Sequence, residues 1–193
     1  MMSNIASNII SLKQQIPLSV KVVAVSKTKP VSSVLEAYNS GQRIFGENRV
    51  QELLSKKELL PDDIEWHLIG HLQSNKVKYI VPFISMIQSV DTFKLLKVID
   101  SESLKANRRV DCLLQFHIAT EETKFGFNME EVTEMIVSEE FSSLKSVRVC
   151  GVMGMATYTW NESQIREEFR YLATCFKALK DKYFSEDASF REI

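Results

Sequence analysis

The sequence has little of the residues that mark specialised protein classes. Of 193 residues, 6 are glycine, 4 are proline and 3 are cysteine. Collagen-like and low-complexity chains contain far more glycine and proline, and disulfide frameworks contain a dense, even set of cysteines. Cys112, Cys150 and Cys175 are widely spaced and lie among apolar residues. We therefore expect buried, reduced thiols in a cytoplasmic protein.

An excess of charge of either sign is also absent. The chain carries 24 Lys+Arg and 25 Asp+Glu, which gives a formal net charge of −1. Proteins that bind nucleic acids or membrane surfaces usually show a basic excess or a basic stripe. The balanced charge therefore argues against both kinds of partner.

Long hydrophobic runs are missing as well. The charge-free stretches at residues 79–90 and 149–161 are shorter than the roughly 20 apolar residues that span a bilayer. Serine and asparagine interrupt residues 1–12, so this stretch has no signal-peptide core. We expect a protein that is neither secreted nor membrane-inserted. No linker or compositional break divides the chain, so residues 1–193 are predicted to form one domain.

The sequence does contain an alternation of two hydrophobic periodicities. Short apolar, β-branched runs predict strands, and segments with a three-to-four-residue spacing predict helices. The predicted strands are residues 20–25, 43–45, 64–68, 85–89, 110–118 and 147–155, with the start of a seventh at 190–193. The predicted helices are 32–40, 49–60, 74–79, a segment from an N-cap at Asp91 toward Arg108, 130–138, and a long helix that opens on a capping box at 161–164.

This alternation favours parallel strands joined by right-handed crossovers. An open doubly wound sheet and a closed (β/α)₈ barrel both satisfy it. A dinucleotide-binding doubly wound sheet has a glycine-rich turn after its first strand, whereas here that turn is SKTKP at residues 26–30. We therefore favour a barrel and expect functional side chains at the carboxyl ends of its strands.

Polar residues do follow the predicted strands. At a barrel mouth, partial burial of Lys27 would lower its pKa and favour the neutral, nucleophilic amine; the alternative is a solvated lysine that ends the strand. Asn48 either offers its amide to a ligand or caps the helix that begins at Arg49. Gly151 and Gly154, at the end of the sixth strand, either admit a flat ligand or ease packing.

His67 and His71 have the spacing of two metal ligands on one helix face. The segment is predicted to be a strand, in which four residues span about 13 Å, too far for both to bind one ion. We therefore expect no metal site. Residues 75–78 and 121–124 are charged segments of a kind that is typical of solvent-exposed loops.

Taken together, the strand ends resemble the pyridoxal phosphate homeostasis proteins, a family similar to the N-terminal barrel domain of alanine racemase. The resemblance is collinear and covers nearly the whole chain. The matching segments are AVSKTKP (24–30), GENRVQE (46–52), EWHLIGHLQSNK (65–76), QSVD (88–91), TKFGF (123–127) and GVMGM (151–155).

The resemblance implies both a fold and a site. The fold would be α/β, a (β/α)₈ TIM-type barrel like the alanine racemase N-terminal domain. Lys27 would hold pyridoxal 5′-phosphate (PLP) as a Schiff base, Asn48 would face the cofactor ring, and Met153 would line the other side of the ring. Lys29 and Lys124 match secondary lysines near the pocket. His71 matches a position to which we assign no catalytic role.

The resemblance also predicts what this chain lacks. Family members continue past the equivalent of Ile193 into segments that supply the seventh and eighth strands, most phosphate contacts and an arginine near the pyridine nitrogen. We therefore expect a barrel with its last one to two strands missing from this chain. The imine half of the site would be present and the phosphate half would not.

The function that the resemblance implies is non-catalytic. The protein would bind PLP reversibly and buffer or deliver it in vitamin B6 homeostasis, as a monomer whose further partners are PLP-requiring apo-enzymes. One alternative is a PLP-dependent racemase, which needs two bases on opposite faces of the cofactor. The second domain of alanine racemase is not present in this chain, so a carrier is preferred. Another alternative is a barrel that binds a different phosphorylated ligand without an imine.

Overall fold

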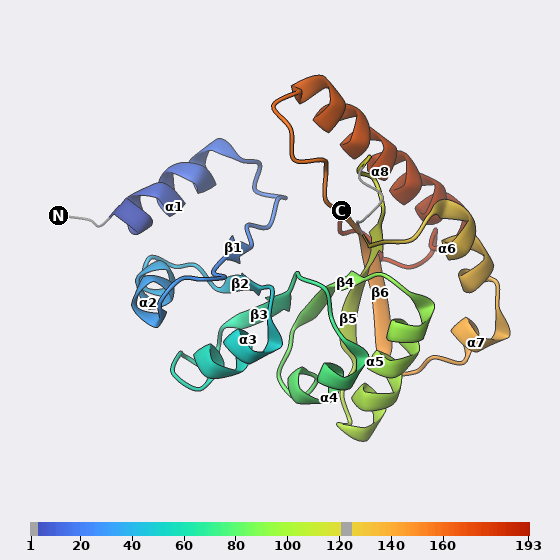
Figure 1. Cartoon of the computed structure of the whole chain (residues 1–193), viewed down its shortest axis with the longest axis horizontal. Coiled ribbons are helices and arrows are strands. Elements are labelled where there is room, and N and C mark those ends of the chain that lie inside the picture. The colour runs from blue at the N-terminus through green and yellow to red at the C-terminus, as the bar shows by residue number, and fades with distance from the viewer. Residues whose placement is uncertain (1–3, 121–124) are drawn as a thin grey trace.

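The computed structural model, which describes residues 4–120 and 125–193, contains one six-stranded parallel sheet. The strands lie in the order in which they occur in the chain, and every neighbouring pair is parallel. A doubly wound sheet reverses its strand order at a switch point, whereas a barrel wall does not. The prediction of a barrel-type α/β fold is therefore confirmed (Figure 1). The strands are β1 (Ala24–Val25), β2 (Ile44–Glu47), β3 (Glu65–Leu68), β4 (Met86–Val90), β5 (Val110–Phe116) and β6 (Val147–Gly154).

Helices follow the strands, as predicted. The predicted helices are confirmed to within a few residues, but two helices were not predicted, namely α1 and α7. Ile5 and Ile9, one turn apart in α1, pack against the core, so a short apolar stripe was the overlooked signal. The helices are α1 (Asn4–Gln15), α2 (Val31–Asn39), α3 (Val50–Lys57), the 3₁₀ turn η1 (Ser74–Lys76), α4 (Val77–Ile80), α5 (Phe93–Lys105), α6 (Met129–Ile136), α7 (Glu139–Ser142) and α8 (Glu162–Tyr183).

Two predicted helix caps differ from the structure. Asp91 does not cap α5, because its carboxylate binds His71 instead. The Thr92 side chain caps the helix by accepting the Leu95 amide hydrogen. Asn161 does cap α8, accepting the Gln164 amide hydrogen at 3.3 Å. The Gln164 side chain donates to other side chains, so the predicted capping box is only half formed.

The first strand is shorter and more exposed than predicted. β1 contains two residues, whereas the sequence predicted a strand at 20–25 that is buried on both faces. Val20 and Val25 are each 51% exposed. Among the described residues β1 pairs only with β2, so it forms the edge of the sheet and has no second neighbour to cover it.

The end of the chain pairs with the opposite edge of the sheet. Glu192 forms a parallel bridge with Gly151, and the Val152 amide donates to the Glu192 carbonyl at 3.1 Å. A Cβ at Gly151 would lie 1.8 Å from that carbonyl oxygen, so the close approach requires glycine. The predicted start of a seventh strand is thus present as a single bridge beside β6.

The hydrophobic core lies mainly between the sheet and its helices. Successive strand residues point to opposite faces, so one side of each strand packs against the helices and the other faces the barrel interior. Among the described residues, the interior face carries a second, small apolar cluster of Met86, Leu113 and Cys150, against which Met153 packs. All three cysteines are free and buried, as expected. Among the described helices, none is both long and apolar enough to cross a membrane.

Two leucines of α5 test where the core lies. Leu96 is fully buried and Leu104 is 60% exposed. We expect Leu96→Ala to lower the free energy of unfolding by about 2–5 kcal/mol, because it leaves a cavity. Leu104→Ala on the same helix should change it by less than about 0.5 kcal/mol. Urea unfolding of both variants measures the difference, and equal effects would contradict this placement of the core.

Candidate functional site

Lys27 and Asn48 lie at the carboxyl edge of the sheet, just after β1 and β2. Val25 of β1 pairs with Gly46 of β2. This is the last pair of the register, after which Lys27 lies in the turn that follows β1 and Asn48 lies in the bend that follows β2. Parallel pairing therefore directs these two predicted site residues to the same edge of the sheet, although they lie 21 positions apart in the sequence.

Lys27 is exposed, which matches the solvated lysine rather than the partly buried one of the two alternatives that the sequence left open. The physical reason is its position beyond the short edge strand, where no second strand among the described residues covers it. No described residue forms a hydrogen bond or ion pair with its amine. The amine is therefore accessible to a ligand from solvent.

Asn48 is half-buried, and its amide is available. The sequence left open a role as the cap of α3, but the N-cap is Arg49, which makes no side-chain cap bond. The Asn48 amide forms no hydrogen bond with any described residue. Gly70 packs against its backbone, since a Cβ on Gly70 would lie 2.6 Å from the Asn48 carbonyl oxygen. A close backbone contact thus places Asn48, while its side chain remains free.

Met153 lines a cavity of about 420 Å³ on the interior side of the sheet. The cavity lies between the β1 and β6 edges, because Val23, just before β1, and Gly154 of β6 also line it. Lys27 and Asn48 are not among its described lining residues, so the structure does not join the three predicted residues in one pocket. Lys29 is exposed, and Lys124 lies outside the described residues.

His67 lines the same cavity and is a buried, neutral imidazole. Its Nδ1 lies 2.8 Å from Nε2 of Gln88, which donates the hydrogen bond. Burial, reinforced by the positive charge of Lys21, lowers the pKa of His67 to about 4, although Glu192 and Asp111 oppose the shift. At neutral pH the Nδ1 atom is therefore an acceptor, and the ring carries no charge.

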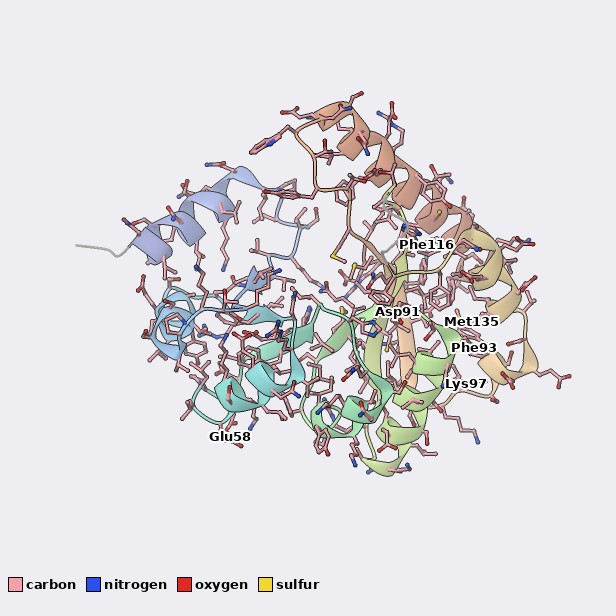
Figure 2. The ribbon with its side chains drawn as sticks, viewed as in Figure 1. Glu58, Asp91, Phe93, Lys97, Phe116 and Met135 are labelled. Carbon is pink, nitrogen blue, oxygen red and sulfur yellow. The ribbon has the colours of Figure 1, made fainter. Side chains whose placement is uncertain are left out.

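His71 forms a separate pair with Asp91. Its Nδ1 lies 2.8 Å from the Asp91 carboxylate, and its ring stacks on Phe125 with the centroids 4.3 Å apart. Asp91, Phe93 and Met135 line a second cavity here, beside α5 and α6 (Figure 2). His67 and His71 thus have different partners. Within residues 4–120 and 125–193 no three histidine, cysteine or acidic side chains form a metal-binding group.

A buried ion-pair network lies beneath the turn that carries Lys27. Lys56 is 4% exposed and Glu47 is fully buried. The Lys56 ammonium donates to Glu47 at 2.6 Å and to Glu52 at 2.7 Å. The second carboxylate oxygen of Glu47 is buried and has no hydrogen-bond partner among the described residues. Lys56 is therefore the only described positive charge that pairs with the Glu47 carboxylate.

The network binds the chain on both sides of Lys27. Lys56 also donates to the Ser26 carbonyl at 2.7 Å, and the Ser26 hydroxyl donates to Glu47 at 2.7 Å. The Thr28 amide donates to Glu52 at 2.7 Å. The three charged residues thus hold both chain neighbours of Lys27 in place.

The pKa shifts in the network follow from these contacts. The hydrogen bond from Lys56 lowers the pKa of Glu52. Burial works to lower the pKa of Lys56, but its bonds to Glu47 and Glu52 outweigh burial, so the pKa is raised. Sequence reasoning missed this network. The four-residue spacing of Glu52 and Lys56 on a predicted helix was a usable signal, whereas the burial of Glu47 was visible only in the fold.

Comparison with known proteins identifies the family. The sequence profile described as "Alanine racemase, N-terminal domain" matches residues 1–189. A pyridoxal phosphate homeostasis protein of Aquifex aeolicus is 39% identical over 164 residues, which cover 84% of this chain and 71% of that protein. The protein of that name in Escherichia coli is 31% identical and covers 94% of this chain. The chain belongs to the pyridoxal phosphate homeostasis protein family.

Solved structures of related proteins agree with this membership. PipY of Synechococcus elongatus, without PLP, matches with a TM-score of 0.87 at 34% identity, covering 93% of this chain and 83% of PipY. PipY with PLP bound matches with a TM-score of 0.83. An alanine racemase from E. faecalis matches with a TM-score of 0.70 at 16% identity, which shows a shared fold alone. The predicted family and its alanine-racemase-like barrel fold are confirmed.

Lys56 tests the importance of the buried network in this family member. Replacing Lys56 by methionine keeps most of the apolar length of the side chain but leaves Glu47 buried without its ammonium partner. We expect Lys56→Met to lower the free energy of unfolding by about 3–5 kcal/mol. Lys57→Met is the control: the Lys57 side chain is 36% exposed and pairs with an exposed aspartate, so a loss below about 1 kcal/mol is expected. If urea unfolding shows a larger loss of unfolding free energy for Lys57→Met than for Lys56→Met, the assignment of Lys56 to a buried network is wrong.

His67 predicts a pH dependence of stability. Its pKa is about 4 in the folded chain and about 6.5 when unfolded, so between these values the unfolded state binds more protons. The contribution of His67 is complete above about pH 6.5 and decreases as the pH falls toward 4. His67→Gln should therefore flatten the decline of the unfolding free energy over this range, measured by urea unfolding. Parallel declines in the two proteins would show that the imidazole is not buried as described.

Proposed function

We propose that this chain binds PLP as a Schiff base on Lys27 and acts as a non-catalytic carrier that buffers or delivers the cofactor in vitamin B6 homeostasis. The observation that carries the proposal is the accessible amine of Lys27 directly after β1, at the carboxyl edge where barrel proteins hold their ligands. Two facts about relatives support it. They are named for PLP homeostasis, and PipY has been solved with PLP bound.

The residues at this edge fit an aldehyde ligand. The neutral Lys27 amine would attack the aldehyde carbon of PLP, and the oxygen would leave as water, which forms the C=N bond without any other reactant. The unbonded amide of Asn48, at the same edge of the sheet as Lys27, would face the ring. Met153 would contact the ring from the cavity side, with Lys29 and Lys124 as secondary basic groups.

A carrier fits this site better than a racemase does. Racemisation needs two bases on opposite faces of the cofactor, and Lys27 supplies one. The likeness to alanine racemases, at 12% to 16% identity, extends to the fold alone. The relatives bear the name of homeostasis proteins rather than of an enzyme.

We further propose that residues 1–193 act as one binding domain, as a monomer in the cytoplasm. PLP-requiring apo-enzymes would be its partners. The free, buried state of all three cysteines supports a reducing compartment.

Borohydride reduction tests the covalent link. The full chain mixed with PLP should absorb light as an imine, bleach on reduction, and yield a reduced-cofactor mass on the peptide that contains Lys27. Lys27→Ala should abolish this adduct because it removes the amine that forms the C=N bond. Lys94→Ala, an exposed lysine of α5, is the control and should leave the adduct intact.

Two results would contradict the proposal. Absence of the adduct from the Lys27 peptide of the unaltered chain would exclude the Schiff base. Robust racemisation of amino acids by the PLP-loaded protein, lost in Lys27→Ala, would exclude a role confined to carrying the cofactor.

A further inference from the structure

The turn at residues 26–28 has a backbone conformation that needs support. Thr28 has a φ of 63°, in the left-handed region that a β-branched residue rarely adopts. Such a conformation costs about 1–3 kcal/mol and persists only where surrounding contacts enforce it. Lys27 precedes this strained residue directly, so the conformation of the turn sets the direction in which its amine points.

The Lys29 amide donates to the Ser26 carbonyl at 3.0 Å across the turn, and two side-chain contacts add to this bond at backbone atoms that flank Lys27. Glu52 accepts the Thr28 amide hydrogen at 2.7 Å. Lys56 donates to the Ser26 carbonyl at 2.7 Å. Neither side chain bonds the Lys27 side chain among the described contacts, so the turn is held while the amine remains free.

The supporting groups are themselves fixed in place. Lys56 bonds both Glu47 and Glu52, and Glu52 and Lys56 lie one turn apart on α3, where their spacing favours the pair. Lys56 is also buried at its point of contact with Ser26. The position of α3 therefore determines the positions of Ser26 and Thr28, the residues on either side of Lys27.

We propose that Glu52 and Lys56 are positioning residues for Lys27, which hold the 26–28 turn with Thr28 in its left-handed conformation and thereby set the rate at which the Lys27 amine reacts with an aldehyde ligand. The proposal rests on the proposed function, because it assigns to these residues a part in the same covalent link. Glu52 and Lys56 set the direction of the Lys27 amine and do not contact the ligand.

Glu52→Ala in the full chain tests the proposal with two measurements. The first is the rate of imine formation with PLP, followed by absorbance and mapped to Lys27 by borohydride trapping. We expect this rate to fall about tenfold or more, since small misplacements of a reacting group are costly. The second, made without PLP, is hydrogen exchange of the Thr28 amide, which should speed up about tenfold when its acceptor is lost.

Two further variants separate positioning from general stability. Glu102→Ala removes a glutamate of α5 that is 23% exposed and paired with a lysine on its own helix, compared with 24% for Glu52. It should leave both measurements within about twofold of the unaltered chain, because a pair with a lysine that is 67% exposed contributes little. Glu52→Gln keeps an oxygen that can accept the Thr28 amide hydrogen, so it should restore most of the rate.

The outcomes distinguish this proposal from the one on which it rests. If the unaltered chain traps no PLP at Lys27, the proposed function fails, and the exchange of the Thr28 amide still reports whether Glu52 holds the turn. If the unaltered chain traps PLP and Glu52→Ala reacts at the same rate, positioning is wrong and the carrier function stands. If the rate of imine formation in Glu52→Ala falls only in proportion to a larger unfolded fraction, which urea unfolding measures, the positioning proposal is also wrong.

Discussion

Parallel pairing of the strands in sequential order is the constraint on which the rest of this structure depends. It directs the carboxyl ends of β1 and β2 to one edge of the sheet, and so places Lys27 and Asn48 at that same edge. The same pairing divides each strand into a helix-facing side and an interior side. The apolar core forms on the first side, and a cavity lined by Met153 remains on the second.

The buried charged residues at the carboxyl edge of the sheet have a second role. Lys56 and Glu47 are both buried, where unpaired charges are costly. Both also bond Ser26, the residue before the exposed Lys27: Lys56 donates to its carbonyl, and Glu47 accepts from its hydroxyl. A network of this kind adds little to stability over a hydrophobic replacement of the whole set. What it supplies is a specified turn, including the left-handed Thr28, beside the exposed Lys27.

Local sequence patterns accounted for most of the fold. The apolar runs predicted all six strands, and the periodicity of residues 165–179 predicted α8. Both patterns were usable because a strand and an amphipathic helix place their apolar residues at different intervals along the chain. Predictions failed where a neighbour decided the outcome. Residues 20–25 gave a two-residue strand because β1 has one described neighbour, and Asp91 did not cap α5 because His71 binds its carboxylate.

For the site, the sequence by itself determined which residues follow the strands and, through the resemblance, the family to which the chain belongs. The spacing of residues along the chain is sufficient for both, because strand ends and the order of motifs can be identified in the linear sequence. Only the tertiary structure decided that Lys27 is exposed, that the Asn48 amide is free of capping, and that Glu47 is fully buried against Lys56. Burial and pairing depend on which segments meet in space, and residues 26, 47, 52 and 56 meet only because β1, β2 and α3 pack together.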